Sequence, residues 1–213
     1  MSHTLGVRQA QKLQTRQALL DAGLRLLENQ SLSSLGLREV TRAVGVAPAG
    51  FYRHFQGIGD LGVALVGEAL GSLHAMIQAI LDEQDDAAEV IQRTVDVIAA
   101  HVRGHRAHIR FIARERHGGV QLVREAIAAE LDQFADEVSA ALAAQPLSAG
   151  WSADDLRMLS ELYVDRMLMT ATAFMEAPAA DPEAEARIAR TARRQLYLMY
   201  LGRRHWLDGQ VAP

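Results

Sequence analysis

The segment from Leu37 to Phe55, LREVTRAVGVAPAGFYRHF, is the feature that most restricts the fold of this 213-residue chain. It holds two short helical patterns separated by Gly45-Val46-Ala47, and the second begins with Pro48. Proline is favourable in the first turn of a helix, and glycine permits the backbone conformation of a tight corner between helices. Two helices joined by such a turn form a helix-turn-helix, whose second helix enters the major groove of DNA. The segment therefore predicts a DNA-binding protein.

The rest of the sequence also reads as helical, because β-branched residues are sparse and Ala, Leu, Arg and Glu dominate. Further helices are expected at residues 15–28, 60–81, 87–103, 106–117, 120–143, 153–176 and 182–204. Thr15, Ser152 and Asp181 are expected to cap the starts of three of them. The prediction is an all-α fold: a three-helix helix-turn-helix domain at residues 1–58, and a helical bundle for ligand binding and dimerisation at residues 59–213.

Charge is divided unevenly between these parts. Residues 1–60 carry seven Lys and Arg against four Asp and Glu, and the other residues carry 15 against 22. A basic domain on an acidic body fits contact with phosphates, although a net charge of +3 over sixty residues is also ordinary. The lack of cysteine excludes disulfides and thiolate chemistry. No apolar run has the length of a membrane span and no signal peptide is visible, so a cytoplasmic location without membrane contact is expected.

The helix-turn-helix segment resembles that of TetR-type one-component repressors in Val46, in the ending Tyr52-x-His54-Phe55 and in Leu61. The residues at 47–48, 51–55 and 60–62 resemble, more narrowly, the FabR/DesT-like regulators of unsaturated fatty-acid synthesis and desaturation. The resemblance covers roughly residues 8 to 62. It implies a repressor that binds a palindromic operator in double-stranded DNA as a homodimer. It also implies that a long-chain fatty acyl-CoA acts as effector, with no resident cofactor.

The same resemblance points to individual DNA contacts. The expected DNA-binding residues are Thr15, Arg16, Arg38, Pro48, Ala49, Gly50, Tyr52, Arg53 and His54. The small residues at 48–50 match base-facing positions, whereas Tyr52 and His54 match positions that contact phosphates. Arg38 matches a position that reaches guanine in some relatives, and its alternative role is that of a solvated helix residue. Gly57 replaces a frequent phosphate-binding lysine, and the N-terminal arm with Arg8 and Lys12 is expected to compensate for this loss.

An effector site is expected in the helical bundle. Arginines between His101 and His117 either form a solvated face paired with the acidic segment 125–137, or bind the phosphates of acyl-CoA. Long apolar residues either belong to the core or line a cavity for the acyl chain. The candidate ligand-binding residues are Arg106, Arg110, Phe111, Arg114, Leu131, Phe134, Met158, Leu162, Met169 and Phe174.

Two other patterns have simpler interpretations. The segment from Gly57 to Gly62 matches the nucleotide-binding pattern GxGxxG, but a helix precedes it instead of a strand, which favours a loop and helix start. His101, His105 and His108 share a helical face and could bind zinc. Gly104 within the triplet and the neighbouring arginines argue against this, so no metal site is expected. No constellation of catalytic residues is recognisable, and the chain is not expected to be an enzyme.

Apolar stripes on the last two expected helices fit either core packing or a dimer interface. They comprise Leu156, Leu159, Tyr163, Met167 and Phe174, and then Ile188, Ala192, Leu196, Met199 and Tyr200. The resemblance favours a homodimer, in which a ligand shifts helix 106–117 against the base of helix 60–81. One alternative is a TetR-type repressor that responds to a different hydrophobic drug or metabolite. The other is a helical lipid-binding or acyl-transfer protein.

Overall fold

The computed structural model describes residues 2–71, 73, 74, 77, 80, 86–178 and 181–209, whose regular elements are all helical. The helices are α1 (Ser2–Leu26), α2 (Leu37–Val44), α3 (Pro48–Phe51), α4 (Ile58–Leu70), α6 (Ala87–Gly104), α7 (Arg106–Glu115), α8 (Gln121–Ala143), α9 (Ala153–Glu176) and α10 (Pro182–His205). Short 3-10 turns are η1 (Leu32–Ser34), η2 (Pro146–Ser148) and η3 (Leu207–Gly209). The prediction of an all-α fold is confirmed. None of the described helices is long and apolar enough to cross a membrane.

Helix starts agree with the sequence where a side-chain cap defines them. The Ser152 hydroxyl accepts the Asp155 N–H at 3.1 Å, and the Asp181 carboxylate accepts the Ala184 N–H at 2.9 Å, as expected. α4 begins inside the glycine pattern, where the Asp60 carboxylate accepts the Gln56 N–H at 2.9 Å. The pattern is therefore the start of a helix.

α1 and α3 differ most from their expected bounds, while α4 begins two residues early, at Ile58, and α7 ends two residues early, at Glu115. α1 begins at Ser2, and Thr15 lies inside it with its hydroxyl donating to the Gln11 carbonyl at 2.9 Å, so the prediction of Thr15 as a cap is wrong. α3 ends at Phe51 instead of Phe55. Beyond Gly71, the predicted helix 60–81 lies largely outside the described residues.

The chain forms two compact units. The head unit comprises Met1–Gly71 with Arg110–Ala128, and the body unit comprises Ser72–Ile109 with Ala129–Pro213. Their contacts therefore group α4 and the segment Arg110–Ala128 with the N-terminal helices. The predicted boundary at residues 58/59 separates DNA binding from ligand binding and dimerisation. This assignment of functions stays a prediction.

Buried apolar side chains hold the head unit together. Leu19, Leu61, Leu65 and Phe51 are completely buried, and Phe55 is 2% exposed. The rings of Phe51 and Phe55 lie 5.5 Å apart. Burial of an aromatic ring stabilises a fold by about 1.5–3 kcal/mol, so these two residues anchor the end of the helix-turn-helix in the core of the head unit.

α7 begins in the body unit and ends in the head unit, and polar contacts fix each end. Arg106 donates to the carbonyls of Met175 and Ala177 at the end of α9. Arg114 donates to the carbonyls of Leu27 at 2.9 Å and Gln30 at 2.7 Å, just beyond α1. Guanidinium groups satisfy the carbonyls that a helix leaves without partners at its end.

A buried carboxylate completes the contact of α7 with the head helices. Glu115 is 1% exposed, and its Oε1 accepts the Leu32 N–H at 2.9 Å. Gly118 lies so close that a Cβ atom there would clash with Glu115 Oε2. Glycine at position 118 therefore makes room for this carboxylate. We call Arg114 and Glu115, with their backbone partners, the α7 clasp.

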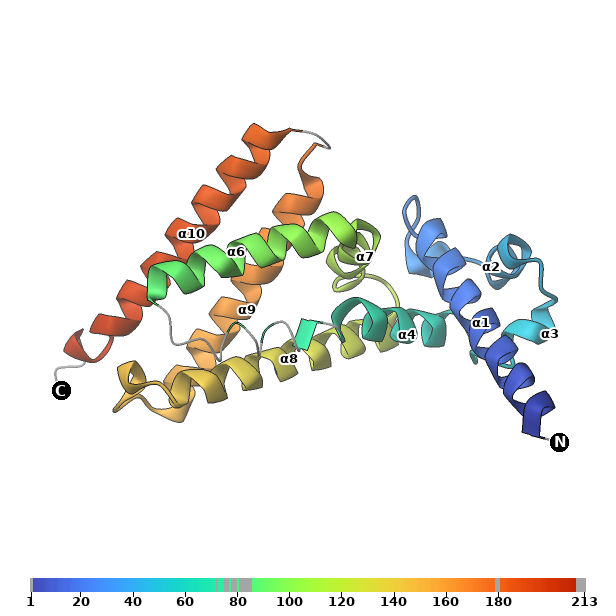
Figure 1. Cartoon of the computed structure of the whole chain (residues 1–213), viewed down its shortest axis with the longest axis horizontal. Helices are drawn as coiled ribbons and strands as arrows, with labels where there is room; N and C mark the ends of the chain where they lie inside the picture. Colours follow the sequence, from blue (N-terminus) through green and yellow to red (C-terminus); the bar gives the residue numbers. More distant parts are fainter. Residues whose placement is uncertain are drawn as a thin grey trace. The chain divides into compact units, whose positions relative to one another are not determined.

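In the body unit, α6, α9 and α10 lie side by side (Figure 1). Leu156, Leu159, Phe174, Ala192 and Leu196 are buried, so much of the predicted stripes forms the core. Arg203 is only 5% exposed. Its guanidinium donates to Ser148 Oγ at 3.2 Å, Gln145 Oε1 at 2.8 Å and the Leu142 carbonyl at 3.2 Å, close to the end of α8.

Candidate nucleic-acid interface

The turn between α2 and α3 is built as the sequence predicted. Gly45 has φ +74°, a left-handed conformation that glycine adopts without strain, and its N–H bonds to the Arg42 carbonyl. Pro48 then occupies the first turn of α3. Because Phe51 and Phe55 face the core, the intervening Tyr52 and Arg53 face outward, and Tyr52 is 61% exposed.

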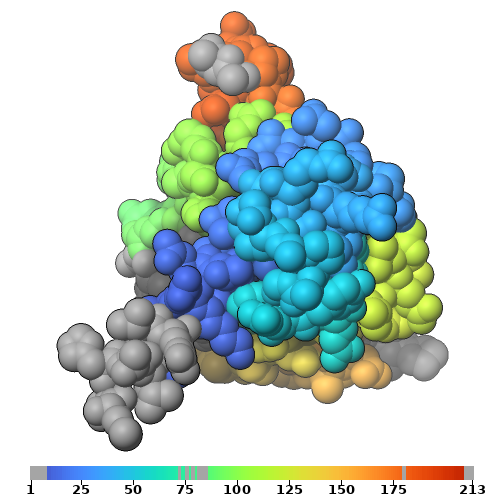
Figure 2. Space-filling view, turned by 90° about the vertical axis from the view of Figure 1, so that its right-hand side faces the viewer, coloured from blue at the N-terminus to red at the C-terminus, as the bar shows by residue number. Residues whose placement is uncertain are grey.

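α1 and the helix-turn-helix enclose a groove of about 680 Å³. It is lined by Gln11, Lys12, Thr15, Val46, Gly50, Arg53 and His54. Figure 2 shows the surface of α2 and α3, in light blue and cyan, beside the dark blue of α1. Two cations and several hydrogen-bond donors therefore share one depression next to the exposed start of α3, an arrangement suited to anionic oxygens.

Arg16 holds the end of this motif in place. Its guanidinium carbon lies 4.5 Å from the centre of the Phe55 ring, and its Nη1 donates to the His54 carbonyl at 3.5 Å. Cation–π contacts of this kind contribute about 0.5–2 kcal/mol. The residue was predicted to contact DNA; here it supports the residues of the groove.

His54 lies in a positive electrostatic environment. Burial, followed by the charges of Lys12, Arg16 and Arg53, holds the pKa of His54 below its usual value of 6.5. The imidazole is therefore neutral at pH 7, and a nearby anion would favour its protonated form. Burial is the main cause of the lowered pKa, and the three nearby cations add to it.

The structure brings the predicted DNA-binding residues to one unit. Arg38, Pro48, Ala49, Tyr52 and Arg53 are exposed, while Thr15, Arg16, Gly50 and His54 are half-buried. Thr15 is bonded within its own helix, so its hydroxyl retains acceptor capacity toward the groove. The sequence interpretation did not place Gln11 and Val46 in the site, and it treated Lys12 only as a compensating residue. The early start of α1 explains why Gln11 and Lys12 line the groove. Because residues 11–15 are helical, both lie on the same face of α1 as Thr15.

The predicted ligand-binding residues are divided between the two units, and their shared role stays a prediction. Phe111, Phe134 and Phe174 are buried and Leu131 is half-buried, whereas Met158, Leu162 and Met169 are 39%, 51% and 50% exposed on α9. Arg106 and Arg114 bond to carbonyls at helix ends. Arg110, Phe111 and Arg114 belong to the head unit and the others to the body unit.

The histidine triplet does not converge on one point. The rings of His101 and His105 stack with centres 4.4 Å apart and planes 17° from parallel, and His108 stands edge-on to His105. Burial, followed by the charges of the other two histidines, lowers the pKa of His101. Stacked rings direct their nitrogens sideways instead of toward a shared centre.

Comparisons with known proteins agree with this geometry. Residues 19–65 match the family described as "Bacterial regulatory proteins, tetR family". An uncharacterized HTH-type transcriptional regulator of Haemophilus influenzae is 38% identical over 135 residues, which are 63% of this chain and 66% of that protein. The chain thus spans just under two thirds of the length of this curated relative.

Two solved structures share the fold at low sequence identity. FadR from Bacillus subtilis in complex with stearoyl-CoA is 14% identical, with a TM-score of 0.67 over 84% of this chain and 96% of that one. A complex of SmeT with triclosan is 15% identical, with a TM-score of 0.64 over 86% of this chain and 90% of that one. At this identity the two structures support the fold alone.

Proposed function

We propose that this chain, whose residues 19–65 match the TetR family of bacterial regulatory proteins, is a transcriptional repressor of that family that binds a palindromic operator. The main support for this proposal is the groove of the head unit, in which Lys12 and Arg53 lie close to the exposed start of α3 at Pro48. Arginine and lysine at a groove of this kind bind phosphates, and base edges are read by the helix that enters the major groove.

The experiment is a gel-shift titration with DNA from upstream of the chain's own gene, followed by footprinting. Binding is expected to protect a palindrome and to weaken steeply as salt rises, because counterions are released from the phosphates. A helical lipid-binding or acyl-transfer protein would give neither result. Absence of sequence-specific protection would therefore favour that alternative.

A homodimer is part of the proposal. Exposed apolar side chains on two neighbouring helices support it: Met158, Leu162 and Met169 on α9, and Tyr197 and Leu198 on α10, the last 69% exposed. Apolar patches of this kind mark protein interfaces. Two copies related by a twofold axis would present two α3 helices to the two half-sites of a palindrome.

The effector that we propose is a long-chain fatty acyl-CoA, which regulates genes of fatty-acid desaturation and unsaturated lipid synthesis through this repressor. The resemblance of residues 47–62 to FabR/DesT-like regulators and the shared fold with the stearoyl-CoA complex of FadR support it. The SmeT–triclosan complex has the same fold, so a hydrophobic drug or metabolite is the second candidate. A thermal-shift comparison of oleoyl-CoA, palmitoyl-CoA, free CoA and triclosan separates them, because a bound ligand raises Tm. A shift with triclosan but not with either acyl-CoA would favour the second candidate.

We further propose that α7 carries the ligand response, since Arg106 is bonded at the end of α9 and the α7 clasp is bonded beside α1 and η1. The substitution Gly118→Ala tests this. Its Cβ would displace the Glu115 carboxylate from the Leu32 N–H. Gel shifts with and without oleoyl-CoA are expected to show that the ratio of the two Kd values falls toward one. Gly104→Ala is the control, because a Cβ there meets nothing within 4 Å. A normal ligand response in Gly118→Ala would exclude the clasp from the coupling route.

DNA binding is expected to take up a proton at His54. Its pKa is low in the free protein, and a phosphate in the groove would raise the pKa in the complex. Operator affinity should therefore increase as pH falls from about 8 toward 6, by up to about tenfold per unit of pKa difference, and level off below the free-protein pKa. Titrations at constant salt measure this effect. The variant His54→Gln should show a flatter profile, and identical profiles for the two proteins would contradict the assignment.

A further inference from the structure

We infer that protonation of His74 holds the chain that follows α4 against α8, and that loss of this proton weakens the contact and changes operator binding. The contact forms within the body unit. Its effect on operator binding rests on the proposed function, whereas the contact itself does not. We call His74, with Glu130, Phe134 and Glu137 of α8, the His74 clamp.

His74 lies between two carboxylates on one face of α8. Its Nδ1 is 2.7 Å from Glu137 Oε1, and its Nε2 is 3.1 Å from Glu130 Oε2. Phe134 lies between the two glutamates in the sequence, and the centre of its ring is 4.2 Å from the centre of the imidazole. Residues spaced three and four apart share one face of a helix. α8 therefore offers the imidazole an aromatic surface and a carboxylate at each ring nitrogen.

This pair of contacts requires a charged imidazole. A neutral imidazole has one N–H donor and one lone pair, whereas an imidazolium has two N–H donors. Ionised carboxylates only accept hydrogen bonds, so a neutral ring would direct its lone pair at one of them. The face of an aromatic ring also attracts a cation. The proton on His74 is therefore what makes both carboxylate contacts attractive.

Loss of this proton would leave the two carboxylates poorly compensated. The side chains of Glu130 and Glu137 are only 28% and 20% exposed. Glu137 Oε2 is buried and accepts no hydrogen bond from the described residues, while Oε1 also accepts the side-chain amide of Gln133 at 3.3 Å. Charged groups that are partly removed from water need an opposite charge nearby. We therefore expect the clamp to loosen when His74 becomes neutral.

The other charges of this region do not replace the proton. Asp132 and Asp136 of α8 are exposed and pair with Arg157 of α9. In the sequence, His74 is the only ionisable residue within 69–81. Among the described residues, the charges that act on the imidazole are thus those of the two glutamates of the clamp.

The pKa of His74 agrees with this geometry. Burial by itself would lower the pKa, but the hydrogen bonds and charges of Glu130 and Glu137 outweigh burial and raise the pKa above its usual value of 6.5. With a raised pKa in the folded state, the stability that the clamp contributes is fully present below pH 6.5. It is lost as pH rises through the folded-state pKa. The clamp therefore holds in weakly acidic solution and loosens in alkaline solution.

The clamp joins two places at which the chain passes between its units. The head unit ends at Gly71, and His74 follows three residues later; the chain passes into the body unit again after residue 128, directly before Glu130. α4 ends at Leu70, and its Leu61 is completely buried in the head unit. The clamp therefore restrains the chain four residues beyond a helix that belongs to the DNA-binding core.

NMR titration of the imidazoles tests the clamp without DNA or ligand. The chain has eight histidines, and the signal of His74 is the one that His74→Gln lacks. Its midpoint is expected above pH 6.5. The double variant Glu130→Gln with Glu137→Gln keeps the size of both side chains without their charge. Its midpoint should be lower, because burial then remains as the main influence. A midpoint at or below 6.5 in the unchanged chain would overturn the clamp.

Urea denaturation measures what the proton contributes to stability. The unchanged chain should exceed His74→Gln more at about pH 6 than at about pH 9, by about tenfold in the unfolding equilibrium constant for each pH unit between 6.5 and the folded-state pKa. The lowered pKa values of His54 and His101 affect both proteins alike and cancel from this comparison. An equal advantage at both pH values would contradict a proton-dependent contact.

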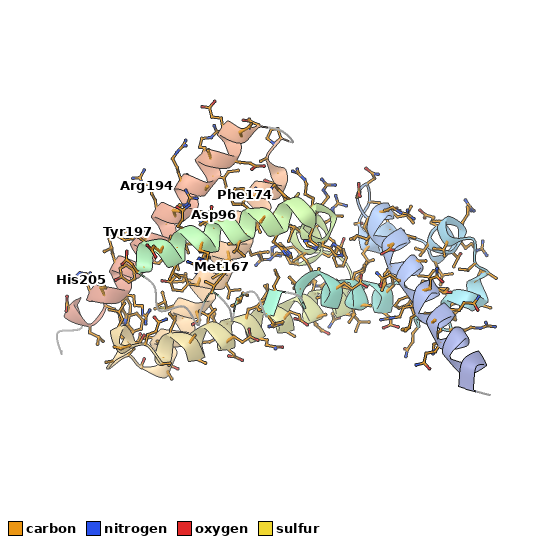
Figure 3. The ribbon with its side chains drawn as sticks, viewed as in Figure 1. Asp96, Met167, Phe174, Arg194, Tyr197 and His205 are labelled. Atoms are coloured by element: carbon orange, nitrogen blue, oxygen red, sulfur yellow. The ribbon has the colours of Figure 1, made fainter. Side chains whose placement is uncertain are left out.

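His205→Gln is the matched control. His205 also pairs with a carboxylate, that of Asp208 at 2.8 Å, but its side chain is 66% exposed at the C-terminal end of α10 (Figure 3). Exposed ion pairs contribute little to stability, so this variant should follow the pH profile of the unchanged chain.

Gel-shift titrations at constant salt test the effect on operator binding. The Kd values of His74→Gln and the unchanged chain should differ at least about twofold near pH 6, as for residues that modulate coupling from outside both sites, and should converge near pH 9. Equal Kd values near pH 6, together with the expected NMR and urea results, would overturn the effect on DNA and leave the clamp as a structural contact. If the unchanged chain binds no operator at any pH, the proposed function fails, and the measurements without DNA still decide whether the clamp exists.

Discussion

Replacing Arg203 with alanine is expected to lower the free energy of unfolding by about 2–4 kcal/mol. A buried polar group that loses its hydrogen-bond partner costs about 1–3 kcal/mol, and this substitution removes the partner of Gln145, Ser148 and the Leu142 carbonyl together. Burial lowers the pKa of Arg203 from its usual range, because removing the guanidinium charge from water costs free energy, which its hydrogen bonds offset. Lysine should not replace it, because a single ammonium cannot reach the acceptors that the guanidinium fork reaches.

Urea denaturation monitored by tryptophan fluorescence measures this loss of unfolding free energy, with both probes close to the end of α10 that carries Arg203. The two tryptophans of the chain are Trp151 and Trp206, whose rings lie 5.7 Å apart, and Trp206 follows α10 directly. Arg204→Ala is the matched control, because Arg204 is exposed and should change stability by no more than about 0.5 kcal/mol. Equal midpoints for the two variants would show that the buried guanidinium does not hold this end of the body unit.

Removing Tyr52 or Arg53 is expected to weaken operator binding by about 10–100-fold each, because a good contact to a phosphate or base edge contributes about 1–3 kcal/mol. Both side chains are exposed, so the free energy of unfolding should stay within about 0.5 kcal/mol of its original value. Affinity is therefore lost without loss of the fold.

The salt dependence of binding by Arg53→Ala identifies what the arginine contacts. If Arg53 binds a phosphate, the slope of log K against log salt should become about one unit shallower, and affinity should fall on all sequences alike. If it reads a base, the slope should persist while discrimination at one position is lost. Arg25→Ala, at an exposed position outside the groove, is the control. Unchanged operator affinity in both Tyr52→Ala and Arg53→Ala would remove the head groove from the DNA interface.

The helix-turn-helix could be predicted from the sequence because its determinants are local. Gly45, Pro48 and the two phenylalanines specify the turn, the start of α3 and its buried side within nineteen residues. α9 was likewise predicted with its observed bounds, since Ser152 caps it visibly. The start of α1 was missed because residues 2–14 lack an apolar stripe. The hydroxyl of Thr15 there imitates a cap while it bonds within the helix.

The roles of the arginines and methionines in the bundle depend on long-range contacts that no local pattern records. Arg106 binds a carbonyl 71 residues away, and Arg114 binds one 87 residues away. Apolar periodicity identifies the sides of α9 without indicating which side faces out, so Met158 and Leu162 were assigned to a cavity while they are exposed. Glu115 did leave a signal, as the one acidic residue among the arginines of its segment.

The side chains of the α7 clasp form hydrogen bonds only to main-chain atoms, namely the carbonyls of Leu27 and Gln30 and the amide of Leu32. Every residue offers the carbonyl, and every residue except proline offers the amide, so these three bonds do not depend on which side chains follow them. The side chains of Leu27 and Leu32 serve the core instead, where both are buried. The exposed recognition residues could therefore change in sequence, or be exchanged for those of a relative, while these bonds persist. A chimera that carries the DNA-binding elements of a relative should therefore keep the ligand response of this chain. A new operator specificity can then arise without changes to the hydrogen bonds of the α7 clasp.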